Sequence, residues 1–290
     1  GVVDMYKSIV ESCDTYYYTL ARDMGVDLIY EHMKPLGFGQ ITGIDILGES
    51  RGVLPSTEWK RTTYKKAEQQ RWYSGETISL GIGQGYNSFT MLQLAHATAT
   101  IANHGLKMKP HIVREVLDVE TKAPTPVAKE PIGQLPLSPE NLDVIKRALI
   151  GVNIEGTSAS SFVGAQYVSA GKTGTAQVYT VKQNEKYNAA TVDERMRDHA
   201  LYIAFAPADE PKVALAMVVE NSGFGAQNAA PIARRVFDFV ILGQYPSEED
   251  IAAVQKGQAT RPIGKPRDLA SVPWPPKNIT STSVPMPAKP

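Results

Sequence analysis

The chain has 290 residues, of which 42% are hydrophobic and 21% are charged, and its 30 Lys and Arg residues balance its 30 Asp and Glu residues. This length supports one large globular domain, or two small ones, with a buried core. Because neither sign of charge is in excess, we expect neither a nucleic acid nor an anionic membrane surface as a partner.

Cysteine and histidine usage argues against a metal site. Cys13 is the only cysteine, which excludes an internal disulfide and a site built from several thiolates. The five histidines lack the H-E-x-x-H spacing of a zinc enzyme. We therefore expect no metal and no cofactor. The chain opens at Gly1 without a signal sequence or an apolar run of membrane-spanning length, so it is either cytoplasmic or targeted by a segment upstream.

The N-terminal residues predict one helix followed by loops. Apolar side chains recur at helical spacing over 2–25, with Ser12 as a candidate cap inside the run and Gly25 as the terminator. Between residues 34 and 79, glycine, proline and polar residues predict loops with little regular structure. Loops of this kind often lie beside a functional site.

Two further helices are marked by their caps. The segment 87–105 is apolar along one face, and we expect it to begin at Asn87 or Ser88 and to end at Gly105. Another helix is expected to begin at Ser138, because the serine cap is followed by proline and glutamate, which suit a first helical turn.

Apolar runs in the last third predict a sheet and a closing helix. The runs 199–207 and 212–221 are separated by proline and aspartate, which predicts an antiparallel hairpin. The segment 228–243 is expected to be a helix. From residue 246 the chain is rich in Pro, Ser, Thr and Lys, so we expect a short helix near 247–256 and then a disordered tail.

The stretch "VSAGKTGTAQ" at 168–177 combines glycines, a lysine and threonines. A phosphate-binding loop would require G-x-x-x-x-G-K-[ST], but Gln166 stands where the first glycine belongs. Such a loop also opens a helix, whereas the residues after Gly174 alternate as a strand does. The sequence therefore argues against a nucleotide site.

An edge strand in this stretch can bind a peptide. Lys172 offers a positive charge to a carboxylate, Thr173 and Thr175 offer hydroxyl donors, and Gly174 has no side chain to block a substrate. The backbone N–H of Thr175 is expected to face a developing oxyanion, and an extended peptide would dock as an added strand. By itself the K-T-G string is also compatible with a plain solvated edge strand.

Four segments in order give the chain a family resemblance. They are "SCDTYYY" at 12–18, "SLGIGQGYNSFTMLQLAHATATIANHG" at 79–105, "SAGKTGTAQ" at 169–177 and "HALYIAFAP" at 199–207. Together they resemble the transpeptidase domains of class B penicillin-binding proteins, most closely the branch that serves rod elongation. The resemblance extends from Gly1 to about residue 244.

The resemblance implies a mixed α/β fold, with an antiparallel sheet flanked by helices, and a site assembled from S-x-x-K, S-x-N and K-[ST]-G elements. Ser12, Cys13 and Asp14 match the second element, with aspartate where many relatives carry asparagine, and the K-T-G at 172–174 matches the third. The implied catalytic residues are Ser12 and Lys172, with Ser12 relaying protons between the S-x-x-K lysine and Lys172, and Asp14 would bind the peptide. The carboxylate would be held by Lys172, Thr173 and Thr175, with Gly174 leaving room for the peptide.

The first element has no counterpart in its expected place. In the family it stands well before the second element, and few residues precede Ser12. Ser169 and Lys172 match S-x-x-K as a string, but on a strand the two side chains do not meet as they would on a helical turn. We therefore expect the nucleophile upstream of Gly1, and no acylation of this chain alone.

The resemblance also implies organisation and partners. Residues 1–245 would be the C-terminal part of a transpeptidase domain, and 246–290 a Pro-rich, largely disordered tail. The expected reaction is peptidoglycan D,D-transpeptidation at the periplasmic face of the inner membrane, with the anchor outside this chain. The implied partners are stem peptides ending in D-Ala-D-Ala, β-lactams and membrane proteins of the elongation machinery, with no nucleic acid. A β-lactamase, a D,D-carboxypeptidase and a non-catalytic peptide-binding module remain alternatives.

Overall fold

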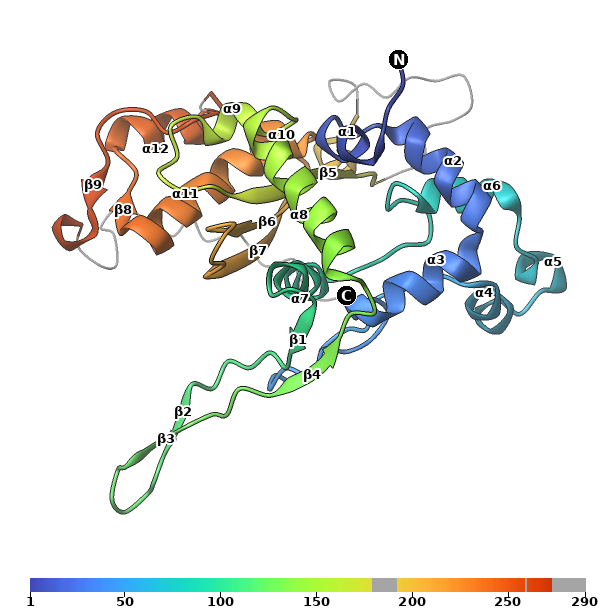
Figure 1. Cartoon of the computed structure of the whole chain (residues 1–290), viewed down its shortest axis with the longest axis horizontal. Coiled ribbons are helices and arrows are strands. Elements are labelled where there is room, and N and C mark those ends of the chain that lie inside the picture. The colour runs from blue at the N-terminus through green and yellow to red at the C-terminus, as the bar shows by residue number, and fades with distance from the viewer. Residues whose placement is uncertain (179–191, 259, 273–290) are drawn as a thin grey trace.

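The computed structural model describes residues 1–178, 192–258 and 260–272. An antiparallel sheet lies among helices, with a helical lobe on one side of it and a thin arm that projects from the body (Figure 1). The mixed α/β class expected from the sequence, with an antiparallel sheet flanked by helices, is confirmed.

The central sheet has the order β5–β6–β7, and both pairs are antiparallel. Its strands are β5 (Ala170–Ala176), β6 (His199–Ala206) and β7 (Val213–Val219). The hairpin predicted from the two apolar runs is therefore confirmed as β6 and β7. β6 pairs with a strand on each side, whereas β5 pairs only with β6 among the described strands, so β5 lies at an edge of the sheet.

Successive side chains of β6 point to opposite faces of the sheet, and helices cover both faces. Ala200, Tyr202 and Ala204 pack on one face against α11 (Ala230–Leu242), the closing helix that the sequence predicts. Phe205 lies on the other face, where the core includes residues of α7 and α8. Small side chains dominate the first face, because successive strand residues point to opposite sides and alanines allow a helix to approach closely.

The N-terminal helix expected over 2–25 is divided in two. α1 (Met5–Val10) and α2 (Asp14–Met24) are separated at Ser12, whose φ of 55° lies in the left-handed region. Such a backbone cannot continue a right-handed helix. Ser12 is not the cap of α2, since Cys13 occupies that position. Gly25 ends α2 as expected, and α3 (Val26–Met33) and the short turn η1 (Lys34–Leu36) follow it.

The expectation of loops over 34–79 is wrong for three short helices. These are α4 (Thr57–Thr63), α5 (Ala67–Gln70) and α6 (Ser74–Leu80). They are too short to show helical periodicity.

The buried side chain of Lys60 links α4 to α6. The Nζ of Lys60 lies 2.5 Å from Oε1 of Glu76 and 5.4 Å from the ring centres of Trp72, Tyr73 and Tyr86. The carboxylate and the rings together replace the water that an ammonium group loses on burial. α4 and α6 are thus joined by a side chain that sequence reasoning would place on the surface.

The two helices predicted from their caps are present. α7 (Met91–Ala102) begins at Thr90, not at Asn87 or Ser88, because Thr90 and Gln93 form a reciprocal capping box. α8 (Pro139–Ile154) begins at Ser138 as predicted, and Ser138 Oγ accepts a hydrogen bond from the backbone of the first turn.

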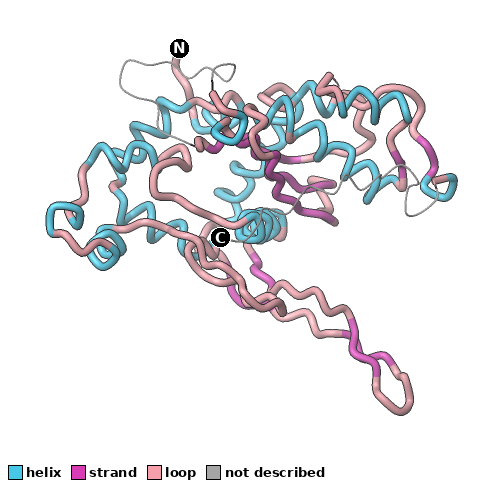
Figure 2. Tube along the Cα trace, turned by 180° about the vertical axis from the view of Figure 1, so that it is seen from behind, coloured by secondary structure: helices cyan, strands magenta, loops and turns pink. Residues whose placement is uncertain are grey.

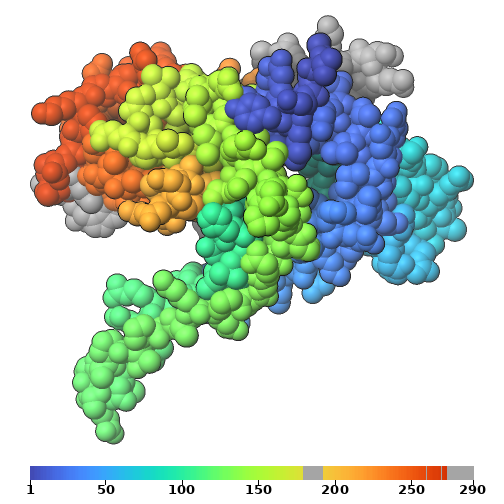
Figure 3. All heavy atoms as spheres, viewed as in Figure 1, coloured from blue at the N-terminus to red at the C-terminus, as the bar shows by residue number. Residues whose placement is uncertain are grey.

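An arm that the sequence did not predict connects α7 to α8. Two antiparallel pairs build it: β1 (Leu106–Met108) with β4 (Pro131–Gln134) at its base, and β2 (Glu115–Leu117) with β3 (Pro124–Pro126) near its tip. The arm projects from the body in both backbone views and in the space-filling view (Figures 1, 2 and 3). Strands this short and exposed carry no alternating apolar pattern.

The C-terminal segment is more ordered than expected. The predicted short helix is confirmed as α12 (Glu248–Gln255). Beyond it, β9 (Arg267–Asp268) pairs with β8 (Gln244–Tyr245), and the turn η3 (Leu269–Ser271) follows. A tail disordered from the end of α12 is therefore wrong for this part. The remainder of the expected tail, 273–290, lies outside the described residues.

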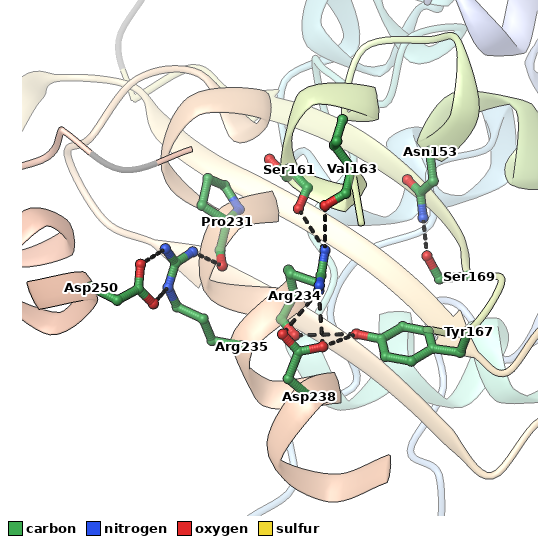
Figure 4. Close-up of polar contacts among 10 residues, drawn as sticks. All are labelled: Asn153, Ser161, Val163, Tyr167, Ser169, Pro231, Arg234, Arg235, Asp238 and Asp250. Atoms are coloured by element: carbon green, nitrogen blue, oxygen red, sulfur yellow. Dashed lines mark hydrogen bonds and ion pairs between the residues drawn. The ribbon is translucent and has the colours of Figure 1, made fainter. Parts of the chain in front are cut away.

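A buried ion pair attaches this segment to α11, and a second pair lies within α11 (Figure 4). Asp250 of α12 is fully buried and accepts two hydrogen bonds from Arg235, at 2.6 and 2.8 Å. The adjacent Arg234 pairs with Asp238 at 2.9 Å, and Asp238 also accepts a hydrogen bond from Tyr167. A two-pronged guanidinium–carboxylate pair fixes orientation as well as distance.

Removing Asp250 should therefore loosen the C-terminal segment. We expect Asp250→Ala to destabilise the protein by about 3–5 kcal/mol, because it leaves the buried guanidinium of Arg235 without its counter-charge. Urea denaturation measures this. Glu248→Ala is the matched control, since its exposed pair with Arg267 should contribute about 1 kcal/mol or less. If the two substitutions lowered the free energy of unfolding equally, the buried pair of Arg235 and Asp250 would not be what stabilises this segment.

Candidate active site

Lys172 and Ser12 meet although 160 positions separate them. The Nζ of Lys172 donates a hydrogen bond to the Oγ of Ser12 at 2.8 Å, and a second to the carbonyl oxygen of Thr173 at 3.0 Å. Ser12 and Asp14 lie in one groove with Lys172, Thr173, Gly174 and Thr175, so the residues singled out in the sequence are brought together.

Close helix packing places Ser12 at this point. α1 lies against α8, and a side chain at Gly151 or Gly156 would have no room: a Cβ there would come within 2.4 Å of the Tyr6 hydroxyl or the Val10 carbonyl oxygen. The left-handed turn at Ser12 then redirects the chain, so that the serine reaches the sheet edge and α2 begins beside it.

The environment of Lys172 lowers the pKa of its ammonium group. Burial lowers the pKa of the Lys172 ammonium to about 8, and the nearby Asp14 carboxylate partly opposes that shift. Burial dominates because an ammonium group loses more solvation on entering the fold than one exposed carboxylate returns. Lys172 is therefore mostly charged at neutral pH and loses its proton at lower pH than an exposed lysine does.

The outer edge of β5 presents its backbone to the groove. The Thr175 carbonyl accepts a hydrogen bond from Nε2 of Gln84 at 2.5 Å, and the Thr173 carbonyl accepts from Lys172. Neither donor belongs to β6, so both carbonyls point away from the sheet. Because the N–H and C=O of one strand residue point to the same side, the N–H of Thr175 also faces the groove.

A buried amide fixes the start of β5. Asn153, at the end of α8, donates to Ser169 Oγ at 2.9 Å and accepts from Ser158 and Tyr202 at 2.6 Å each. The Asn153–Ser169 contact is drawn in Figure 4. Ser169 is thus buried at the entrance of a strand, and the S-x-x-K string at 169–172 does not join its serine to its lysine.

The groove is also lined by residues that were not among the site candidates from the sequence. Thr157 pairs with Thr173 through their hydroxyls at 2.9 Å, Phe224 is 63% exposed at the groove wall, and Gln84 contacts β5. In the sequence, the polar residue Gln84 between Gly83 and Gly85 was the feature that could have indicated a side chain in the groove. The open groove has a volume of about 790 Å³, enough for an extended peptide end.

Comparison with known proteins decides the family. Residues 1–238 match the family described as the penicillin binding protein transpeptidase domain. The chain belongs to this family. Peptidoglycan D,D-transpeptidase MrdA of Acinetobacter baumannii is 43% identical over 244 residues, which cover 83% of this chain and 35% of that protein. MrdA of Haemophilus influenzae is 40% identical over 258 residues, covering 86% and 38%.

Solved structures of penicillin-binding proteins agree. Pseudomonas aeruginosa PBP2, in complex with WCK 5153, matches with a TM-score of 0.67 and 36% identity, over 85% of this chain and 48% of that one. Helicobacter pylori PBP2, in complex with MreC, matches with a TM-score of 0.66 and 27% identity, over 83% and 40%. The family expected from the sequence, of the PBP2 type, is confirmed.

The chain covers little more than a third of these curated relatives, 35% and 38% of their lengths. Within the part that the structure describes, no helix has both the length and the apolar character to cross a bilayer. The same residues contain no cluster of three or more His, Cys, Asp or Glu side chains suited to a metal ion.

The buried lysine should reduce the stability of the fold. We expect Lys172→Met to raise the free energy of unfolding at pH 7 by about 2 kcal/mol, because the folded state disfavours the charged ammonium. The difference from the unaltered protein should shrink above pH 8, where Lys172 loses its proton and its own burial penalty. Thermal or urea unfolding across this pH range tests it. If Lys172→Met is instead less stable than the unaltered protein at pH 7, the hydrogen bonds of Lys172 contribute more to stability than its burial costs.

Proposed function

We propose that this chain belongs to a peptidoglycan D,D-transpeptidase of cell-wall elongation, which cross-links stem peptides through a serine acyl-enzyme, and that residues 1–245 are the C-terminal part of its transpeptidase domain. The observation that carries the proposal is the hydrogen bond between Lys172 and Ser12 beside the open edge of β5. Family membership and the MrdA relatives support it.

The groove offers a separate interaction for each part of a D-alanyl-D-alanine end. The charged Lys172 and the hydroxyls of Thr173 and Thr175 would hold the terminal carboxylate. The peptide backbone would lie along β5 as an added strand, where Gly174 leaves room for it. Asp14, at the first turn of α2, would accept a hydrogen bond from the peptide.

The same edge can stabilise the transition state. A serine oxygen attacks the penultimate D-alanine carbonyl, and the negative charge develops on the carbonyl oxygen. The Thr175 N–H faces that side, and one such donor contributes about 3 kcal/mol in comparable sites. The attacking serine and its lysine would come from sequence outside these 290 residues, and the acyl-enzyme would then be resolved by an amine of a neighbouring strand.

Ser12 is suited to carry protons between two lysines. Its Oγ accepts a hydrogen bond from Lys172, which leaves its own proton free to be donated. We assign it the relay between Lys172 and the lysine of the S-x-x-K element. The proton taken from the attacking serine would reach the departing D-alanine amine by this route.

Location and partners follow from the same proposal. The enzyme would act in the periplasm, tethered to the inner membrane by a segment outside this chain. Helicobacter pylori PBP2 has been solved in complex with MreC, and another similar structure is described as part of a peptidoglycan synthase complex. Membrane proteins of the elongation machinery are thus the proposed partners, with β-lactams as inhibitors.

Acylation by benzylpenicillin tests the proposal. Intact-mass measurement should find one adduct on the protein extended upstream of Gly1, and none on this chain alone. Ser12→Ala should slow acylation of the extended protein by at least about 100-fold, in the range of general acid–base contributions. Thr19→Ala, on an exposed turn of α2, is the control.

Two outcomes would contradict the proposal. An adduct on this chain alone would place the nucleophile within it, and a folded extended protein without an adduct would favour a binding module. With an amine acceptor, release of the free acid alone would favour a carboxypeptidase or β-lactamase.

The pH profile should report Lys172. Its folded-state pKa is about 8, and the charged form binds the carboxylate. We therefore expect the second-order acylation rate to fall as the pH rises through about 8. In Lys172→Arg the guanidinium keeps its charge, so whatever activity remains should not decline in that window. A rate that stays constant up to pH 10 in the unaltered protein would contradict carboxylate binding by this lysine.

A further inference from the structure

The side chain of Gln84 lies along the open edge of β5. Its Nε2 donates to the Thr175 carbonyl at 2.5 Å, and its Oε1 accepts from the Gln177 N–H in a longer contact of 3.4 Å. One amide therefore uses an acceptor and a donor of the strand edge at the same time. These are the two kinds of group that an adjoining strand would use.

The loop that carries Gln84 is held in place by its backbone. Gly83 N–H bonds to the Leu80 carbonyl and Gln84 N–H to the Ser79 carbonyl, the paired pattern that ends a helix at a left-handed glycine. Gly83 has a φ of 78°, as this pattern requires.

The start of the loop is also fixed against α2. A Cβ on Gly81 would lie 2.5 Å from the Tyr17 carbonyl oxygen, so α6 and α2 touch at this point. Because α2 begins beside Ser12, the backbone of Gln84 is set at a defined position relative to the proposed machinery.

We infer that Gln84 is a specificity-determining residue that occupies the peptide-binding edge of β5 until a ligand amide displaces it. The inference rests on the proposed function, since it requires the substrate to add as a strand on β5. A ligand whose own amide N–H reaches the Thr175 carbonyl replaces the hydrogen bond from Gln84. A ligand without such an amide leaves Gln84 in place and gains nothing from this carbonyl.

Two β-lactams separate these classes. Benzylpenicillin carries an acylamino group next to its ring, whereas imipenem carries a hydroxyethyl group there. In the protein extended upstream of Gly1, we expect Gln84→Met to speed acylation by benzylpenicillin about fivefold, the equivalent of one net hydrogen bond no longer displaced. The imipenem rate should not change, so the ratio of the two rates shifts by the same factor.

The controls keep the test decisive. Gln84→Glu has nearly the same size but cannot donate to the Thr175 carbonyl, so it should shift the ratio in the same direction. Gln69→Ala, at an exposed position in α5, should leave both rates unchanged. Rates that fall together for both β-lactams, or an unchanged ratio in the Gln84 variants, would show that Gln84 only supports the strand. Unaltered protein that neither compound acylates would refute the proposed function itself, whatever the variants do.

Discussion

The hydrogen bond from Lys172 to Ser12 is the contact on which the groove depends, because it joins the sheet to the start of α2. It forms only if β5 is held against β6 and α1 is held against α8, and the second condition requires glycine at 151 and 156. The same contact places an ammonium group where solvation is poor, which lowers its pKa. The same packing thus sets the position of the Lys172 ammonium group and lowers its pKa.

The open edge of β5 imposes a second constraint on the groove. An unpaired strand edge tends to pair with any available strand, so proteins usually cover it. Here the side chain of Gln84, from the α6–α7 loop, covers part of it. This part of the edge is therefore protected by a side chain rather than by another of the described strands.

Burial of charge recurs in the molecule, but with different compensation. Lys60 is surrounded by Glu76 and aromatic rings, and Arg235 is bound by both oxygens of Asp250. Lys172, in contrast, has a serine hydroxyl and a backbone carbonyl as hydrogen-bond partners and one carboxylate nearby. Structural charges are paired within the fold, whereas the charge in the groove is left able to bind an anion, as expected where binding matters more than stability.

The family, the mixed α/β class, the β6–β7 hairpin and the cap at Ser138 could be predicted from the sequence, because these depend on local pattern and ordered motifs. Sequence reasoning misplaced the start of α7, missed α4 to α6 and the arm, and extended the disordered tail too far. Those features depend on contacts without a periodic signal, such as Lys60 among its rings and Asp250 with Arg235. The resemblance placed Ser12 and Lys172 in one site, but their direct hydrogen bond is visible only in the tertiary structure. The same is true of the contact of Gln84 with Thr175 across 91 positions, since strand pairing and helix packing set both distances.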